Sequence, residues 1–336
     1  MHGWRSLVVG LAWQVDGTDY TAGAFTESTT NDEVVTIYEL FEEDGKAYAT
    51  LSYQFAWPTI TDPEGVERDF IQYPGTCVPH DYAGFSDKVT GMGWTKAGAI
   101  SYMSEPYKAK IPVNMHVGCM GLAPASHDSV DSIPPMPTGG NLDDKRIGKG
   151  TTMYYPVEVA GALLSMGDAH MAQGDSELDG TGIETSITGT FKITLIKAAA
   201  FPEPWMSVLD FPLGSTSKDY IVHGFTETDY LETFADNPGD IYGASSIDKA
   251  MANTYTQTRK FVMAAYGLTA DEANTIITQG IDFGMTQLVD GNWGVHAIIP
   301  KAIFADESRR RALSAKPGPW RRQLEAAAAQ LAHAKA

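Results

Sequence analysis

The sequence predicts a mainly β protein with an α+β portion in its C-terminal part. Short runs rich in Val, Ile, Thr, Tyr and Phe recur along the chain, and 33 glycines and 18 prolines separate them. Helix-type patterns appear only after about residue 245. We therefore expect a mainly β body over residues 1–200, an α+β segment over residues 201–304 and a basic tail over residues 305–336.

The strand predictions rest on alternation of apolar and polar residues. Residues 34–38 and 47–53 flank a turn at residues 43–46 and are expected to form a hairpin. Residues 151–159 alternate, with Pro156 typical of an edge or a bulge. Residues 183–195 place apolar side chains on one face and polar ones, including Glu184, on the other, so we expect a long strand with a bend at Gly189.

Two helices are expected late in the chain. The first begins after Ser245-Ser246 and ends at Gly267, and the second begins with Thr269-Ala270-Asp271-Glu272, which has the form of a capping box. The pattern then predicts strands over residues 283–289 and 294–299, joined by Asp290-Gly291-Asn292.

Charge and composition exclude several classes of protein. The chain has 24 Lys and Arg against 42 Asp and Glu, a formal charge of −18, which argues against binding of nucleic acid or of anionic lipid. Its last 32 residues hold seven basic and three acidic residues and favour a mobile tail. Two cysteines are read as reduced thiols. The apolar run at residues 7–13 is expected to be a strand rather than a signal peptide, which favours a cytoplasmic protein.

Residues 167–184 concentrate the chemistry. They contain five carboxylates, one imidazole and the amide of Gln173, interleaved with glycines. In an extended backbone Asp168 and His170 project to the same side. Crowded carboxylates repel one another unless a proton or a cation intervenes, and an Asp with a His favours zinc or a neighbouring transition ion. Plain surface turns and a structural calcium site remain the alternatives.

Two further polar positions lie upstream. Asn141 and Asp143 have strand spacing in Gly139-Gly140-Asn141-Leu142-Asp143, and His116 stands in an apolar run where a buried structural histidine is the commoner reading. The sequence has no G-x-S-x-G, P-loop, HExxH or CxxC motif, so a Ser-His-Asp route has no local support.

Four blocks of sequence follow one another between residues 116 and 184. They are His116-Val117-Gly118 with Gly121-Leu122-Ala123-Pro124, Gly139 to Asp143, Lys149-Gly150-Thr151-Thr152-Met153-Tyr154-Tyr155-Pro156-Val157, and the Gly167-Asp168-Ala169-His170 segment continuing through Glu184. In this order the blocks resemble the acetamidase/formamidase family, and the likeness covers roughly residues 105–304. The first 105 residues depart from the family's usual opening.

The resemblance implies barrel-like or jelly-roll sheets, a homo-oligomer, and hydrolysis of small linear amides to carboxylate and ammonia. A divalent ion, zinc or else calcium, would be held by Asp143, Asp168 and His170. Glu177 or Glu184 would carry the proton, while Asn141, Gln173 and His116 would orient the amide; His116 is also counted among the catalytic candidates. The rival readings are hydrolysis of cyclic amides on the same scaffold and a non-catalytic β module stabilised by calcium.

Overall fold

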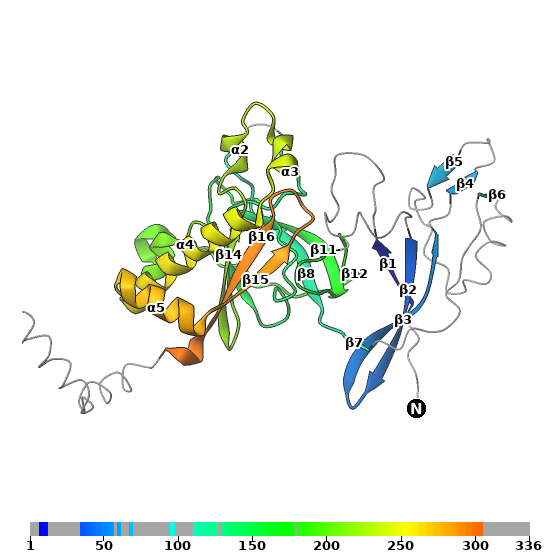
Figure 1. Cartoon of the computed structure of the whole chain (residues 1–336), viewed down its shortest axis with the longest axis horizontal. Coiled ribbons are helices and arrows are strands. Elements are labelled where there is room, and N and C mark those ends of the chain that lie inside the picture. Colours follow the sequence, from blue (N-terminus) through cyan, green and yellow to red (C-terminus); the bar gives the residue numbers. More distant parts are fainter. Residues whose placement is uncertain are drawn as a thin grey trace, which may run out of the picture. The chain divides into compact units, whose positions relative to one another are not determined.

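The computed structural model describes residues 7–12, 34–56, 59–61, 67–69, 95–97, 110–126, 129–178 and 180–304 (Figure 1). Contacts divide the chain into a unit of Met1–Ile299 and a unit of Pro300–Ala336. The described residues form open sheets of three to five strands, together with helices that are concentrated after residue 229.

The first of two central sheets has four strands in the order β12-β11-β8-β9. The longest, β11, pairs antiparallel with both β8 and β12, and β8 pairs antiparallel with β9. Each of the four strands carries at least one of the predicted site residues, so this sheet positions the candidate site. The bounds are β8 (His116–Gly121), β9 (Gly139–Asn141), β11 (Ser165–Ala172) and β12 (Ile183–Glu184).

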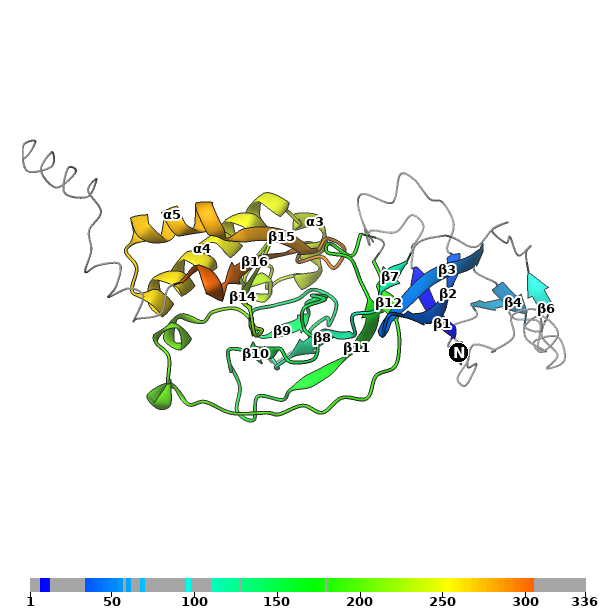
Figure 2. The same cartoon turned by 90° about the horizontal axis from the view of Figure 1, so that it is seen from below.

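The second central sheet has five strands in the order β10-β13-β14-β16-β15. Figure 2 shows the two long helices, α4 and α5, on one side of this sheet, and α4 packs against β14. The five strands of this sheet are β10 (Thr152–Tyr154), β13 (Leu213–Ser215), β14 (Asp219–Phe225), β15 (Asp282–Gln287) and β16 (Gly294–Pro300).

The N-terminal part contributes a sheet of order β1-β2-β3-β7 and a smaller one of order β5-β4-β6. Ala49 of β3 belongs to one buried apolar cluster with Met171, Ala172 and Ile183, so the first of these sheets packs against the end of β11. The bounds are β1 (Leu7–Ala12), β2 (Val34–Glu43), β3 (Lys46–Ala56), β4 (Thr59–Thr61), β5 (Glu67–Asp69), β6 (Thr95–Ala97) and β7 (Ile111–Pro112).

The helix predictions are confirmed, because their signals are local. Helix α4 (Ile247–Tyr266) begins where the Ser246 hydroxyl accepts a hydrogen bond from the amide of Lys249, and it ends at Gly267 with φ 64°. Helix α5 (Ala270–Gly280) has both hydrogen bonds of the capping box between Thr269 and Glu272. The short elements are α2 (Tyr230–Thr233), α3 (Ile241–Ala244), η2 (Ala198–Ala200), η3 (Pro204–Val208), η4 (Pro238–Asp240) and η5 (Lys301–Ile303).

The predicted strand over residues 183–195 is wrong beyond Glu184. After the Thr185 amide donates to the Ala169 carbonyl, the segment leaves the sheet as an extended stretch that carries no strand (Figure 2). Ile193 and Leu195 are 72% and 66% exposed. The alternation of apolar and polar residues is compatible with a strand, but a strand forms only where a second strand is available to pair with it.

The prediction for residues 151–159 is shortened to β10, which ends before Pro156 because proline has no amide hydrogen for a ladder. The hairpin of β2 and β3 and the pair β15–β16 are confirmed. The mainly β class is thus confirmed in these residues, while their sheets are open and the barrel or jelly-roll arrangement stays a prediction. The division at residue 200 also stays a prediction.

None of the described helices has the length and apolarity needed to cross a bilayer.

His296 of β16 gives the second central sheet a pH-dependent stability. Its ring is 1% exposed and lies opposite Gly284, where an added Cβ would come within 2.8 Å of the imidazole. Burial lowers the pKa of His296 from 6.5 to about 4, so the folded protein keeps the ring neutral. Because the unfolded chain binds the proton first, stability that is present above pH 6.5 is lost as the pH falls toward 4.

We expect His296 to contribute about 3 kcal/mol to the loss of unfolding free energy between pH 6.5 and pH 4. Urea unfolding of the wild type and of His296→Gln across this range would measure the contribution as the difference between the two pH profiles. Parallel profiles would contradict it.

Candidate active site

Strand β11 meets β8 so that the polar residues of the two strands face one another. His170 is opposite His116 and Ala169 is opposite Val117, a register that puts Asp168 beside Gly118. On the other side of β8, the carbonyl of Gly118 accepts hydrogen bonds from the amides of Leu142 and Asp143. Gly118 therefore lies between the segments that carry Asp143 and Asp168.

The missing side chain of Gly118 makes the space in which the predicted ligands meet. A Cβ there would lie 2.4 Å from Asp143 Oδ1, 2.6 Å from Asp168 Oδ2 and 2.9 Å from His170 Cε1. Real Cβ atoms do not approach other atoms so closely, so the three groups occupy the position that any other residue's side chain would fill.

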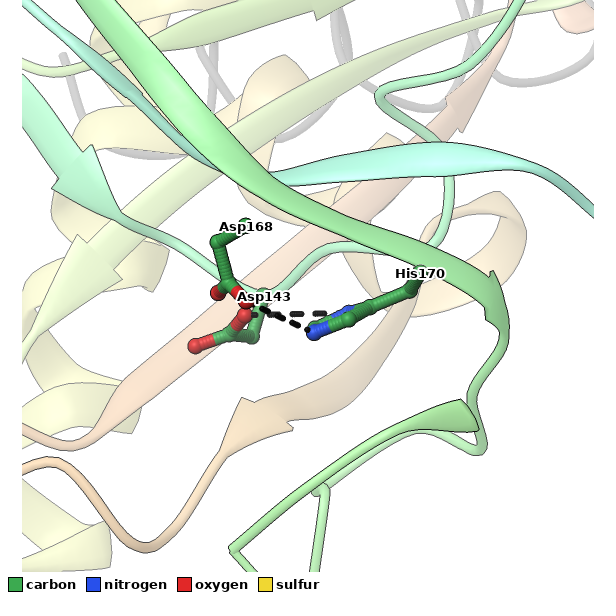
Figure 3. A group of neighbouring side chains, drawn as sticks. All are labelled: Asp143, Asp168 and His170. Carbon is green, nitrogen blue, oxygen red and sulfur yellow. Dashed lines mark ion pairs between the residues drawn. The ribbon is translucent and has the colours of Figure 1, made fainter. Parts of the chain in front are cut away.

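Asp143, Asp168 and His170 point toward one another (Figure 3). His170 Nε2 lies 3.2 Å from Asp168 Oδ1 and 2.9 Å from Glu184 Oε1, and His170 Nδ1 lies 3.9 Å from Asp143 Oδ1. His170 and Asp143 are 1% and 3% exposed, whereas the side chain of Asp168 is 37% exposed. Burial lowers the pKa of His170, but the hydrogen bonds to the two carboxylates outweigh it and raise that pKa to about 11.

A second group of carboxylates adjoins the first. The acidic loop after β11 is tied to the end of β15, because the Ser176 amide donates to the Thr286 carbonyl and the Leu288 amide donates to the Ser176 carbonyl. This contact brings Glu177 beside Asp143 and Asp290, with one oxygen of each within 4.8 Å of the others. Burial, then the neighbouring charge of Asp143, raises the pKa of Glu177 to about 10, and burial also raises those of Asp143 and Asp290.

The residues present fit a divalent cation. Asp143 Oδ1 and Asp290 Oδ2 are buried and accept no hydrogen bond from the described residues. Buried carboxylate oxygens without a donor are costly, and a positive ion is the partner that satisfies several at once. Overlapping sets of three potential ligands are available: Asp143, Asp168 and His170; His170, Glu177 and Glu184; and Asp143, Glu177 and Asp290.

Three of these carboxylates stand on strained backbone. The φ angles are 47° at Asp143, 56° at Asp168 and 45° at Glu177, all in the left-handed region. A non-glycine residue there costs on the order of 1–3 kcal/mol unless its surroundings hold it, and such strain gathers at functional sites. The backbone is thus held in the conformation that directs these side chains inward.

Gln173 and His116 lie behind His170. Gln173 Oε1 is 2.7 Å from His170 Nδ1 and 3.1 Å from His116 Nε2, and Gln173 Nε2 donates to the backbone carbonyl of Asp143 at 2.7 Å. His116 is 1% exposed, with its Nδ1 2.8 Å from the carbonyl of Asn114. The two imidazoles meet edge to face.

Asp144, next to Asp143, belongs to a separate ionic network. Its carboxylate is fully buried and accepts from His223 Nε2 at 2.9 Å, and from the backbone amide and Nη1 of Arg146. Burial alone would raise the pKa of Asp144, but the hydrogen bond and charge of His223, together with Arg146, hold it well below its usual range. Arg146 also binds the half-exposed carboxylate of Asp175 through two hydrogen bonds. Asp175 therefore binds Arg146 rather than His170.

Asn141 and Cys119 are paired on neighbouring strands beside the site. The side-chain amide of Asn141 makes no hydrogen bond to the described residues. Burial, followed by the charges of Asp143 and Asp168, raises the pKa of Cys119 to about 11, so it stays a neutral thiol at pH 7. Cys77 and Asp179 lie outside the described residues.

The structure therefore links seven of the predicted site residues by contacts, and Asn141 stands beside them. Sequence reasoning missed Asp290, which lies in the turn between β15 and β16, and the role of Gly118. Both enter the site through contacts between distant segments, and a lone Asp-Gly turn carries no signal that distinguishes it from other turns.

Comparisons with known proteins show the family to which this chain is related. The model of the acetamidase/formamidase family matches residues 104–306. A formamidase of Methylophilus methylotrophus is 42% identical over 171 residues, which are 46% of this chain and 42% of that protein. An acetamidase of Mycolicibacterium smegmatis is 44% identical over 57 residues, 17% of this chain and 14% of that protein. The chain thus spans less than half the length of each.

Among solved structures, an acetamidase from Yersinia enterocolitica has 22% identity and a TM-score of 0.46, covering 62% of this chain and 54% of that one. The chain is a member of the acetamidase/formamidase family.

Proposed function

We propose that this chain is an amidase that hydrolyses the C–N bond of small linear amides such as formamide and acetamide, with a divalent cation held by Asp143, Asp168 and His170. The observation that carries the proposal is the convergence of these groups on the space beside Gly118, with a buried oxygen of Asp143 that no described donor satisfies. Membership of the family supports the reaction class.

The chain's own residues supply binding and proton transfer. A cation bound there would polarise the amide carbonyl and acidify the attacking water. Glu177 is 6% exposed and lies beside Asp143 and Asp290; with a cation offsetting the charge of these neighbours its carboxylate would be ionised, take the water's proton and return it to the departing nitrogen. Glu184 is the alternative, although its Oε1 already accepts from Thr181 Oγ1 and the Gly182 amide. The products are a carboxylate and ammonia.

Asn141 is proposed as the contact that orients the substrate amide, because β9 pairs with the strand that carries Gly118 and Asn141 lies two residues before Asp143. His116 would act through His170 rather than on the substrate, since it lies behind that ring. Zinc is the proposed ion, in keeping with an imidazole among the ligands, and calcium is the second choice. We also propose, from the composition and the family resemblance, that the protein is cytoplasmic and forms a homo-oligomer.

The test combines elemental analysis of the purified protein with ammonia release from formamide and acetamide, scored beside ring opening of a cyclic amide. His170→Ala and Asp168→Asn should each abolish turnover while the far-ultraviolet circular dichroism stays unchanged; asparagine is chosen because it tolerates the left-handed backbone. Asp282→Asn, an exposed carboxylate of β15, is the matched control and should be fully active.

Normal turnover in both site variants would overturn the assignment. Ring opening without ammonia release would favour a lactamase. The calcium-stabilised module would be favoured if calcium raised the melting temperature, zinc did not, and no amide were consumed.

A further inference from the structure

Gln173 is engaged at both ends of its side-chain amide. Its Oε1 faces His170 Nδ1 at 2.7 Å, and its Nε2 donates to the backbone carbonyl of Asp143 at 2.7 Å. Because a carbonyl can only accept, the end of the amide that points at Asp143 must be the nitrogen. The oxygen is therefore the end that faces the imidazole, and the amide orientation is fixed by the contacts themselves.

This orientation determines which nitrogen of His170 would keep its hydrogen when a cation binds the other. The Gln173 oxygen accepts from Nδ1–H, and Nε2 is the nitrogen that points toward Asp168 and Glu184. Histidines that bind metals donate their other ring N–H to an oxygen, and that bond fixes both the tautomer and the angle of the ring. Gln173 is placed to serve this purpose for His170.

The same side chain acts on Asp143. Asp143 has φ 47°, and the hydrogen bond from Gln173 to its carbonyl is one of the contacts that hold this left-handed peptide, together with the bond from its amide to the Gly118 carbonyl. One amide thus connects two proposed ligands that lie 27 residues apart in the sequence.

We propose that Gln173 is a positioning residue that presents His170 Nε2 and the Asp143 carboxylate to the cation together, rather than a contact for the substrate. This inference rests on the proposed metal centre. His116 supports it from behind: its Nδ1 faces the Asn114 carbonyl, and its Nε2 lies 3.1 Å from Gln173 Oε1 and 3.2 Å from His170 Nδ1. The two buried histidines and the partly buried Gln173 therefore restrain one another.

Two variants separate the two contacts of Gln173. Gln173→Met keeps the length of the side chain and removes both hydrogen bonds. Gln173→Glu keeps an acceptor for His170 Nδ1 but loses the donor to the Asp143 carbonyl. Gln279→Met, on the exposed face of α5, is the matched control for the first substitution.

The measurement is the zinc dissociation constant by competition with a chelator, together with the ring ¹⁵N and Nδ1–H resonances of His170 in the zinc-free protein. We expect Gln173→Met to weaken zinc binding about 10- to 100-fold and to lose the slowly exchanging Nδ1–H signal. Gln173→Glu should retain that signal yet bind zinc more weakly than the wild type, and Gln279→Met should match the wild type.

Zinc binding by Gln173→Met within twofold of the wild type, with an unchanged His170 resonance, would overturn the positioning role and leave the metal centre standing. A wild type that binds no zinc and no calcium would instead overturn the centre, and the role of Gln173 with it. Circular dichroism of each variant establishes that a loss of binding is not a loss of folding.

Discussion

Gly118→Ala is expected to lower zinc affinity and kcat/KM by about 100-fold or more, because the added methyl group occupies the space where the ligands meet. The new Cβ would stand 2.4 Å from Asp143 Oδ1 and 2.6 Å from Asp168 Oδ2, so both carboxylates must move. The displaced atoms belong to residues in left-handed conformation, which have few alternative positions. Overpacking of this kind also lowers the free energy of unfolding by about 1–3 kcal/mol.

The neighbouring strand supplies the control. Gly167 of β11 directly precedes Asp168 in the chain, but no atom lies within 4 Å of an added Cβ there, so Gly167→Ala should retain activity and zinc binding. Ammonia release and chelator competition on the two alanine variants measure the difference. Equal activity in both would show that the space beside Gly118 is not needed.

Asp144→Ala is expected to lower the free energy of unfolding by about 3–5 kcal/mol, because it leaves His223 and Arg146 without their buried counter-charge. The carboxylate has no exposed surface and accepts hydrogen bonds from both residues. Since the same segment carries Asp143, we expect zinc affinity to fall as well. Urea unfolding at pH 7 measures the first effect.

Asp175→Ala is the matched control for Asp144, because it removes the other carboxylate that binds Arg146. The Asp175 side chain is 34% exposed, and exposed ion pairs contribute at most about 1 kcal/mol. Because His223 and Arg146 hold the pKa of the Asp144 carboxyl below 3.8, its contribution to the free energy of unfolding is present above pH 3.8. That contribution is lost as the pH falls through the lower pKa that Asp144 has in the folded protein. Losses of similar size in the two variants at pH 7 would contradict the assignment of the buried network.

Local signals were sufficient to predict the helices and part of the site. The caps of α4 and α5 depend on residues within one turn of each helix end, so Ser246, Gly267 and Thr269 indicate them without knowledge of the fold. Likewise, the two-residue spacing of Asp168 and His170 is enough to place them on one side of an extended chain.

What the sequence did not predict depends on distant segments. The residues after Glu184 alternate as a strand would, but no described strand pairs with them. Asp290 reaches the site only because the loop at Ser176 pairs with the end of β15, more than 100 residues away. The role of Gly118 follows from the register of three strands, and a single glycine within a β pattern does not reveal it.

The left-handed carboxylates set a condition for engineering this protein. Glycine at position 143 or 177 would relax the backbone and remove a carboxyl group whose burial is costly, so it should make the chain more heat-tolerant while deleting a proposed ligand or proton carrier. A directed-evolution campaign that scores survival of heating alone would therefore enrich inert clones. Screening for thermal tolerance here has to include turnover in every round of selection.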